Sequence, residues 1–311
     1  MQVKTLSTSR YNSTNAVAYV APSGTTRAIF GYGYTTAAVS LTNLVSNTGV
    51  VATDTTGVGT ARQQPGAATY GTDKAIFGYG WTSVQVSITN LVSNTGVVAT
   101  DTTGVGTARF QVSAAGYGTD KAIFGYGTTD GNVDTSVTNL VSNTGVVATN
   151  TTGVGTARQG TAAAGYGRDK AIFGYGSTGA FTPVSMTNLV SNTGVVATDT
   201  TGVGTARQRL AAAGYGTDKA IFVYGGSYNV SITNLVSNTG VVSGDSTGIG
   251  TYRMALAGSG YGNDKAIVAY GFDGSNRSMS NLISNTGIIA SDTTGVGSAR
   301  YNLAAAGYST T

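Results

Sequence analysis

Few side chains in this sequence could perform chemistry, because it contains no histidine, cysteine or glutamate. Oxygen ligands outside the repeated text crowd at Asp130, Asp134 and Asp273-Gly-Ser-Asn. Calcium takes such ligands, but the spacing of an EF-hand loop is absent. Paired carboxylates facing a pocket could hydrolyse a glycosidic bond, whereas Asp130 and Asp134 share a single loop. We therefore expect no metal, no cofactor and no enzymatic activity.

The composition narrows the function further. Without His and Cys the chain lacks the usual transition-metal ligands and the common nucleophile-base pairs. Only 10% of its 311 residues are charged and the net charge is +4, so no basic nucleic-acid face is indicated. Gly57-Val-Gly59 lacks the remaining glycine and lysine of a nucleotide loop. No run of about 18 apolar residues and no apolar leader are present, which predicts neither membrane insertion nor Sec export.

One long segment recurs six times between Thr26 and Arg300. It reads Lys-Ala-Ile-Phe-Gly-Tyr-Gly, a variable stretch, Thr-Asn-Leu-Val-Ser-Asn-Thr-Gly-Val-Val-Ala-Thr-Asp-Thr-Thr-Gly-Val-Gly-Thr-Ala-Arg, a second variable stretch, and Ala-Ala-Gly-Tyr-Gly. The glycine after Ser-Asn-Thr recurs at steps of 46 to 49 residues, at Gly49, Gly96, Gly145, Gly194, Gly240 and Gly287. This period suits supersecondary units of about four short strands.

Four strands are predicted in each copy: a first over residues 162–166, a second over 170–175, a third over 86–92 and a fourth from 97 to 100, each given in one example copy. The third shows the alternation of apolar and polar residues that is typical of a half-buried strand. The turns Gly-Thr-Asp-Lys and Ser-Asn-Thr-Gly separate them. The 47 glycines exclude long helices. We predict an all-β, six-bladed β-propeller with four antiparallel strands per blade, with seven blades as the alternative.

The two ends of the chain do not match in the repeat. The second and third strands occur six times, whereas the arginine that ends the fourth occurs seven times, at Arg10, Arg62, Arg109, Arg158, Arg207, Arg253 and Arg300. A spare first strand follows at residues 302–308. Strands from both ends are expected to close the ring, and the carboxy-terminal copy can replace the divergent amino-terminal one. Residues 1–25 are thus a divergent segment for closure or attachment, and residues 26–311 a single repeat domain.

The copies differ in two stretches, one between the second and third strands and one after the arginine. In an up-and-down blade both connections lie on one face, and they carry aromatic and charged residues of the types that anchor recognition. Unconstrained loops would also drift, which is the alternative explanation. The candidate ligand-binding residues are Tyr34, Trp81, Phe110, Asp130, Asp134, Phe181, Arg209, Tyr228, Phe272, Asn276 and Arg277. The near-identical turns of the opposite face predict a scaffold or docking surface.

The repeated aspartate of Ala-Thr-Asp-Thr-Thr and the arginine eight residues later are expected to have a structural role. Together they can form bonds between strands or between blades. Asn150 replaces the aspartate in one copy, which suggests that hydrogen bonding at this position matters more than charge.

The order of these features resembles the kelch repeat: a strand that ends in Phe-Gly-Tyr-Gly, a variable loop, a strand that leads into Asn-Thr, and a last strand that ends in Ala-Arg. The tyrosine and tryptophan usual in the third and fourth kelch strands are missing, and Gly-Tyr-Gly replaces the glycine pair. The wording Ala-Thr-Asp-Thr-Thr-Gly-Val-Gly-Thr-Ala-Arg is similar to kelch-like tandem repeats in structural and tail-fibre-like proteins of cyanobacterial and other marine bacteriophages.

This resemblance implies a non-enzymatic virion structural protein at a fibre, tail or capsid surface. Its expected partners are other virion proteins and a host surface glycan or protein, with oligomers possible, and its expected location is the virion, assembled in the host cytoplasm. An intracellular kelch-like scaffold for protein partners is the alternative, and a secreted bacterial lectin is a third. Detection in purified particles would separate the first from the others.

Overall fold

The computed structural model describes residues 25–179, 181–226 and 231–310. Within these ranges all regular structure is β-strand, apart from one short 3-10 helix, η1 (Asp130–Asn132). The strands form six antiparallel sheets, one for each copy of the repeat, and one additional two-stranded sheet. The predicted all-β class is confirmed. None of the described residues belongs to a helix of the length and apolarity that crossing a bilayer requires.

Each copy contributes strands at corresponding positions. The Ala-Gly-Tyr segments form β3 (Gly66–Tyr70), β6 (Ser113–Tyr117), β9 (Ala162–Tyr166), β14 (Ala211–Tyr215), β18 (Ala257–Tyr261) and β21 (Ala304–Thr310). The Ala-Ile-Phe segments form β1 (Thr25–Gly31), β4 (Lys74–Trp81), β7 (Lys121–Gly125), β10 (Lys170–Gly174), β15 (Lys219–Val223) and β19 (Lys265–Phe272). The Thr-Asn-Leu-Val segments form β2 (Thr42–Val45), β5 (Gln85–Val92), β8 (Thr138–Val141), β13 (Thr187–Val190), β16 (Ile232–Val236) and β20 (Asn276–Ile283). The remaining strands are β11 (Ser177–Thr178), β12 (Thr182–Pro183) and β17 (Ser246–Thr247).

The predicted fourth strand is wrong for most copies. Among the described sheets only β14-β15-β16-β17 has four strands, and in the second copy the segment from Val97 onward makes isolated bridges to β5. The reason is a side chain. Nδ2 of Asn90 donates to the carbonyl of Ala99 at 3.0 Å and to Oδ1 of Asp101 at 2.9 Å, so an amide holds a segment that a backbone ladder would otherwise hold.

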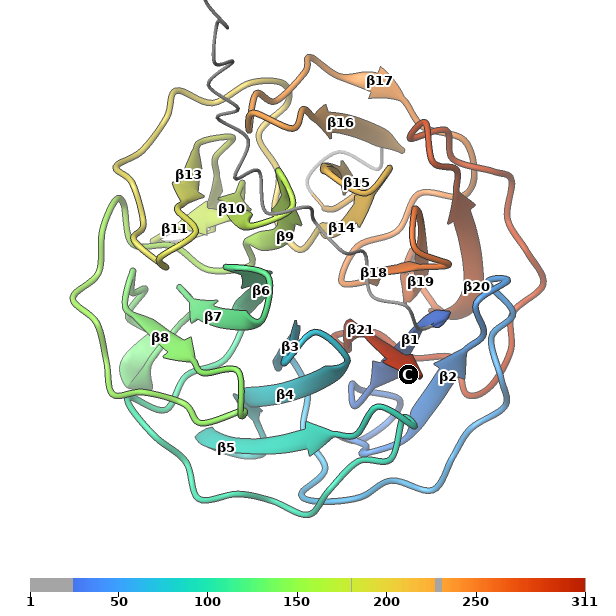
Figure 1. Ribbon diagram of the computed structural model, residues 1–311, viewed down its shortest axis with the longest axis horizontal. Coiled ribbons are helices and arrows are strands. Elements are labelled where there is room, and N and C mark those ends of the chain that lie inside the picture. Colours follow the sequence, from blue (N-terminus) through green and yellow to red (C-terminus); the bar gives the residue numbers. More distant parts are fainter. Residues whose placement is uncertain (1–24, 180, 227–230, 311) are drawn as a thin grey trace, which may run out of the picture.

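The six sheets lie around a common centre, with the Ala-Gly-Tyr strands innermost (Figure 1). These inner strands contact one another in the cyclic order β21, β3, β6, β9, β14, β18 and back to β21. Six apolar clusters fill the spaces between consecutive sheets. Each sheet therefore buries its faces against its two neighbours, because no single sheet can cover its own apolar surface.

Aromatic contacts set the spacing between neighbouring sheets. Tyr79 packs edge-on against Phe124 of the next copy, with ring centroids 5.1 Å apart. Gly78 makes this approach possible, because a Cβ there would lie 2.8 Å from Cζ of Phe124. In the fifth copy Val223 replaces the glycine, and Val268 of the sixth copy replaces the phenylalanine that would face it. Both valines are fully buried in one cluster, so the two sequence changes compensate one another in volume.

The sheet of the first copy takes its inner strand from the other end of the chain. β21 pairs antiparallel with β1, with Thr25 opposite Thr310 and Gly31 opposite Ala304, and the strand order is β2-β1-β21. The carboxy-terminal segment thus replaces the divergent amino-terminal one, as the sequence allows. The predicted role of residues 1–24 in closure or attachment, and Arg10 with it, lies outside the described residues.

Candidate functional site

The repeated arginine is buried between copies and bound on all sides. Nε of Arg62 donates to the carbonyl of Tyr79 at 2.8 Å and Nη2 donates to Oδ1 of Asn90 at 2.7 Å. Its guanidinium lies 4.0 Å from the ring centroid of Tyr32 in the preceding copy, where the ring face favours a cation. The equivalent residues, all at most 1% exposed, are Arg62, Arg109, Arg158, Arg207, Arg253 and Arg300. We call this arginine, with its tyrosine, asparagine and aspartate partners, the arginine clamp.

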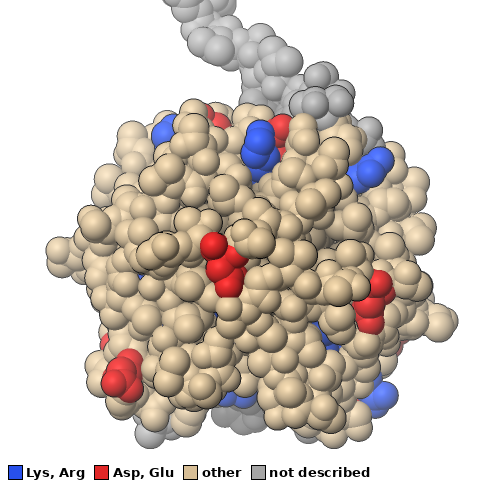
Figure 2. All heavy atoms as spheres, turned by 90° about the horizontal axis from the view of Figure 1, so that it is seen from below, with Lys and Arg blue, Asp and Glu red and all other residues tan. Residues whose placement is uncertain are grey.

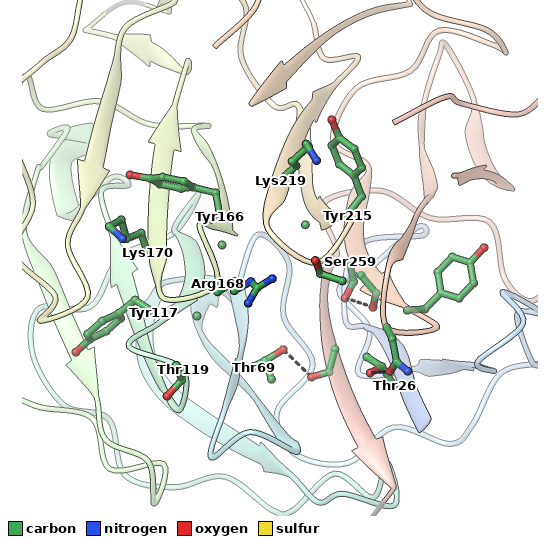
Figure 3. Close-up of a pocket in the computed structure, with 18 of the residues that line it drawn as sticks. Thr26, Thr69, Tyr117, Thr119, Tyr166, Arg168, Lys170, Tyr215, Lys219 and Ser259 are labelled. Atoms are coloured by element: carbon green, nitrogen blue, oxygen red, sulfur yellow. Dashed lines mark hydrogen bonds between the residues drawn. The ribbon is translucent and has the colours of Figure 1, made fainter. Parts of the chain in front are cut away.

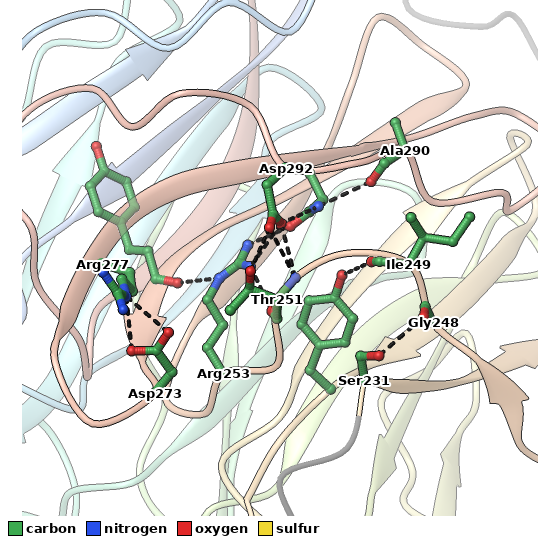
Figure 4. A network of polar contacts seen from close by, with 12 residues as sticks. Ser231, Gly248, Ile249, Thr251, Arg253, Asp273, Arg277, Ala290 and Asp292 are labelled. Carbon is green, nitrogen blue, oxygen red and sulfur yellow. Dashed lines mark hydrogen bonds and ion pairs between the residues drawn. The ribbon is translucent and has the colours of Figure 1, made fainter.

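The repeated aspartate completes the clamp of the preceding copy. Figure 4 shows Asp292 accepting from the backbone N–H and Oγ1 of Thr251, with Nη1 of Arg253 3.6 Å from its Oδ1. Burial raises the pKa of Asp292, but hydrogen bonds from Thr251 and Asn281 and the charge of Arg253 outweigh it and lower the pKa. The repeated charges therefore join consecutive copies, and the predicted structural role is confirmed.

The two variable stretches meet on one face. The residue after each arginine forms an isolated bridge with the residue after Phe-Gly-Tyr-Gly, for example Gln63 with Trp81 and Phe110 with Thr128. We call the surface formed by these stretches the loop face. The turns Gly-Thr-Asp-Lys and Ser-Asn-Thr-Gly also contact one another, as in the bond from Nδ2 of Asn143 to Oδ2 of Asp120 at 3.1 Å. They form the turn face.

Most candidate aromatic residues of the loop face are paired with each other. The rings of Trp81 and Phe110 lie 5.2 Å apart, and Tyr301 lies 5.6 Å from Tyr34 and 5.2 Å from Phe272. Each of these side chains is half-buried. The expectation that Trp81 and Phe272 are exposed is therefore wrong, because each covers an aromatic ring of the following variable stretch. Tyr301 was missed, although it directly follows Arg300 as Phe110 follows Arg109.

One aromatic candidate extends into solvent. Phe181 is 55% exposed and has a left-handed φ of 63°. Nearby, Asp134 accepts from the backbone N–H of Gly179 at 2.9 Å and from Oγ1 of Thr128 at 3.3 Å. Burial raises the pKa of Asp134 above its usual value. Phe181 and this half-buried carboxylate bring an apolar ring and a polar group into neighbouring loops.

The acids singled out for calcium are used in other ways. Asp130 is exposed in η1 and bonds only the backbone N–H of Gly131 at 2.9 Å among the contacts shown by the structure. Asp273 forms an ion pair with Arg277, whose Nε lies 2.8 Å from Oδ1 (Figure 4). Among the described residues no group of three or more acidic side chains comes close enough to hold a metal ion.

The remaining candidates occupy different places. Nδ2 of Asn276 donates to the carbonyl of Thr35 in the next copy at 3.0 Å. Arg209 lies near the centre of the loop face, in a cavity lined by all six variable stretches that follow an arginine. Tyr228 lies outside the described residues. Thus the structure gathers the candidates on one face but distributes them over several copies.

A larger cavity of about 290 Å³ opens at the centre of the turn face. Lys121, Lys170, Lys219 and Lys265 line it, and each lies within 3.5 Å of the aspartate that precedes it. Figure 3 shows Arg168 reaching toward the middle of this cavity. Sequence analysis did not single out Arg168, although it replaces the threonine of Gly-Thr-Asp-Lys and so breaks the repeat on a face that is otherwise nearly uniform.

The turn face also exposes one aliphatic side chain per copy. These residues follow Ser-Asn-Thr-Gly and are 64 to 66% exposed: Val50, Val97, Val146, Val195, Val241 and Ile288. Charges are sparse on the side of the molecule seen in Figure 2. The turn face thus presents a uniform apolar pattern, whereas the loop face presents different groups in each copy.

Comparison with known proteins adds no assignment. No protein-family model matches the chain, and a search of curated proteins finds no match either.

Proposed function

We propose that the chain is a six-bladed β-propeller in which each of the six sheets is a blade. The cyclic contacts of the inner strands, the pairing of β1 with β21, and a cluster of apolar residues between each two consecutive sheets support this. In such a ring the last clamp joins the last copy to the first. Arg300 bonds Asn43 and lies 3.8 Å from Asp54, both in the first copy.

The function that the geometry supports best is non-enzymatic recognition of a surface glycan by the loop face. One observation carries it: side chains differ between copies only where they surround this face, and Phe181 projects there at 55% exposure. Exposed aromatic rings beside polar groups suit sugar rings, which combine apolar C–H faces with hydroxyl groups. The clamps use the repeated charges for folding and leave the loop stretches free to vary.

The place of action is a virion surface, at a bacteriophage fibre, tail or capsid, with attachment to the host as the task. The resemblance of the repeats to those of phage structural proteins supports this placement. The turn face, with its six uniform aliphatic side chains, would then contact other virion proteins.

A protein-interaction scaffold of the kelch-like kind is the second candidate. The exposed aliphatic side chains, such as Val195 at 66%, favour it, because apolar surface of this kind marks protein interfaces. A secreted lectin is a variant of the first candidate and would use the same loop face.

A glycan array with the purified chain tests these alternatives. Phe181→Ala should weaken glycan binding by about 1–3 kcal/mol, as loss of an aromatic anchor usually does, with an unchanged melting temperature because the ring is exposed. Val195→Ala, on the turn face, is the matched control and should bind as the unaltered chain does. Absence of glycan binding, or an effect of Val195→Ala alone, would reject the glycan proposal. Mass spectrometry of purified phage particles tests the placement.

A further inference from the structure

Six residues occupy equivalent positions around the centre of the loop face. All have left-handed backbone conformations, with φ between 53° and 59°: Gln64, Gln111, Gly160, Arg209, Ala255 and Asn302. Their amides and carbonyls form a chain of hydrogen bonds from copy to copy. In this chain Asn302 donates to Ala255 at 2.9 Å, and Ala255 donates to Arg209 at 2.7 Å. Five of the six possible links are present.

The missing link lies between Gly160 and Gln111. No hydrogen bond joins the amide of Gly160 to the carbonyl of Gln111 in this described part of the chain. Gly160 is also the one position of the six without a side chain. A Cβ placed there would lie 3.1 Å from Oε1 of Gln111 and 3.4 Å from Cγ of Arg209. The two longer side chains thus flank the space that the glycine leaves open.

Two polar atoms beside this space have no partner. Oε1 of Gln111 and Nε of Arg209 are both buried and make no hydrogen bond. Gln111 is only 9% exposed, so the missing partner costs about 1–3 kcal/mol unless something supplies it. By contrast, Asn302 is satisfied, because its Nδ2 donates to Oε1 of Gln63 at 2.8 Å. The unmet acceptor and donor are confined to one side of the ring.

These groups line a cavity of about 80 Å³, which has room for several water-sized groups. Its wall is otherwise apolar, with Pro65, Leu210 and Leu256 among the lining residues. Arg209 brings a positive charge, and no carboxylate within the described ranges forms an ion pair with it. An unpaired guanidinium in a partly apolar cavity favours a carboxylate, which it can bind through two parallel hydrogen bonds.

We propose that this cavity binds the carboxylate and one neighbouring hydroxyl of an acidic sugar residue. The carboxylate accepts from the guanidinium of Arg209, and the hydroxyl donates to Oε1 of Gln111. This assignment rests on the proposed glycan-binding function of the loop face, and it specifies the class of sugar. The hydroxyl is what distinguishes a uronic acid from a simple carboxylate at this site.

Titration calorimetry with D-glucuronate, D-glucose and acetate tests the site on the whole chain. We expect saturable binding of glucuronate, with glucose and acetate at least tenfold weaker. Arg209→Gln should lose at least tenfold in glucuronate affinity. Lys265→Gln, which removes one positive charge from the turn face, is the matched control and should change nothing.

Gly160→Ala provides a second variant that fills the cavity without removing a charge. Its backbone conformation is tolerated by alanine, since Ala255 has a φ of 53° at the equivalent position, and a melting curve checks the fold. It should also abolish glucuronate binding. Equal binding of glucose and glucuronate, unchanged binding by Arg209→Gln, or no saturable binding at all would overturn the proposal, the last outcome leaving a cavity that holds only water. If neutral glycans still bind in a Phe181-dependent manner, the acidic-sugar site alone fails and the proposed function stands.

Discussion

Arg300 donates a hydrogen bond of 2.7 Å through Nη2 to Oδ1 of Asn43, across 257 positions of the sequence. Arg62 makes the same contact with Asn90 at 2.7 Å, across 28 positions. The contact between the last and first copies is thus chemically equivalent to the contacts between copies that follow one another in the chain. Five predictions follow from these contacts and from the packing around them.

Removal of the last strand should destabilise the whole structure. Deletion of residues 304–311 takes away β21, including the buried side chains of Ala306 and Tyr308 and the ladder to β1. We expect a loss of more than about 3 kcal/mol, because apolar burial and backbone hydrogen bonds disappear together. A thermal melt of the truncated chain measures it. An unchanged melting temperature would show that β21 does not hold the first sheet in place.

The clamp should depend on hydrogen bonding more than on charge. Asn150 occupies the aspartate position, where its Oδ1 accepts from the amide of Thr107 at 3.1 Å and its Nδ2 donates to Oγ1 of the same residue at 2.7 Å. We therefore expect Asp101→Asn to cost less than about 1 kcal/mol, and Asp101→Ala about 1–3 kcal/mol, since the alanine leaves donors unpaired. Urea unfolding compares the two variants. Equal losses would mean that the charge itself is required.

Acid should weaken the fold through the clamp aspartates. The pKa values of five of them are lowered from 3.8 because hydrogen bonds and a nearby arginine outweigh their burial: Asp54, Asp101, Asp199, Asp245 and Asp292. A lowered folded-state pKa gives stability that is present above the unfolded value and lost as pH falls below it. Urea midpoints should thus fall below pH about 4. Asn150→Asp adds a sixth such group and should steepen the fall; a variant with the same acid profile would contradict this origin.

Alkali should weaken the fold at a higher pH than free tyrosine titrates. Burial raises the pKa values of Tyr126, Tyr224 and Tyr270 to about 12. Since the folded state holds these protons more tightly, its stability is full below about pH 10 and declines as the pH rises toward 12. Absorbance at the phenolate band should show a late group of tyrosines whose ionisation coincides with loss of the near-ultraviolet circular dichroism. A single transition near pH 10 with the fold intact would contradict it.

The contact between Gly78 and Phe124 should be replaceable by two valines. Gly78→Val alone should destabilise by about 1–3 kcal/mol through overpacking, and Phe124→Val alone by a similar amount through a cavity. The double variant should lose less than the sum, because Val223 and Val268 already form this arrangement in the chain. A double-mutant cycle on unfolding free energies measures the coupling. Additive losses would show that the two positions do not compensate.

Sequence reasoning located the strands well where the backbone itself forms the ladder. The segment from Ala162 to Tyr166 is a strand with the predicted bounds. It failed for the fourth strand, since a propensity argument cannot know that Asn90 will hold Ala99 through its side chain. The closing role of the carboxy-terminal copy could be predicted because the repeat is spare at that end.

The site was predictable as a face but not in its details. Both variable stretches could be assigned to one side from strand alternation alone. That Trp81 would be half-buried against Phe110 could not be read from sequence, because the pairing depends on how two loops cross in space. The cavity beside Gly160 depends on a glycine and on two side chains from the flanking copies. Among the missed residues, Arg168 alone gave a signal, since it interrupts the repeated Gly-Thr-Asp-Lys turn.

The arginine clamp has a consequence for the history of the gene. Each clamp reaches the neighbouring copy, so a copy that is duplicated or exchanged by recombination brings the groups that both of its junctions need. Recombination between near-identical repeats can therefore reshuffle the variable stretches among positions while every junction keeps its bonds, as Arg300 and Asn43 do across the two ends of the chain. Such a chain can acquire new combinations of loops without first acquiring a new scaffold.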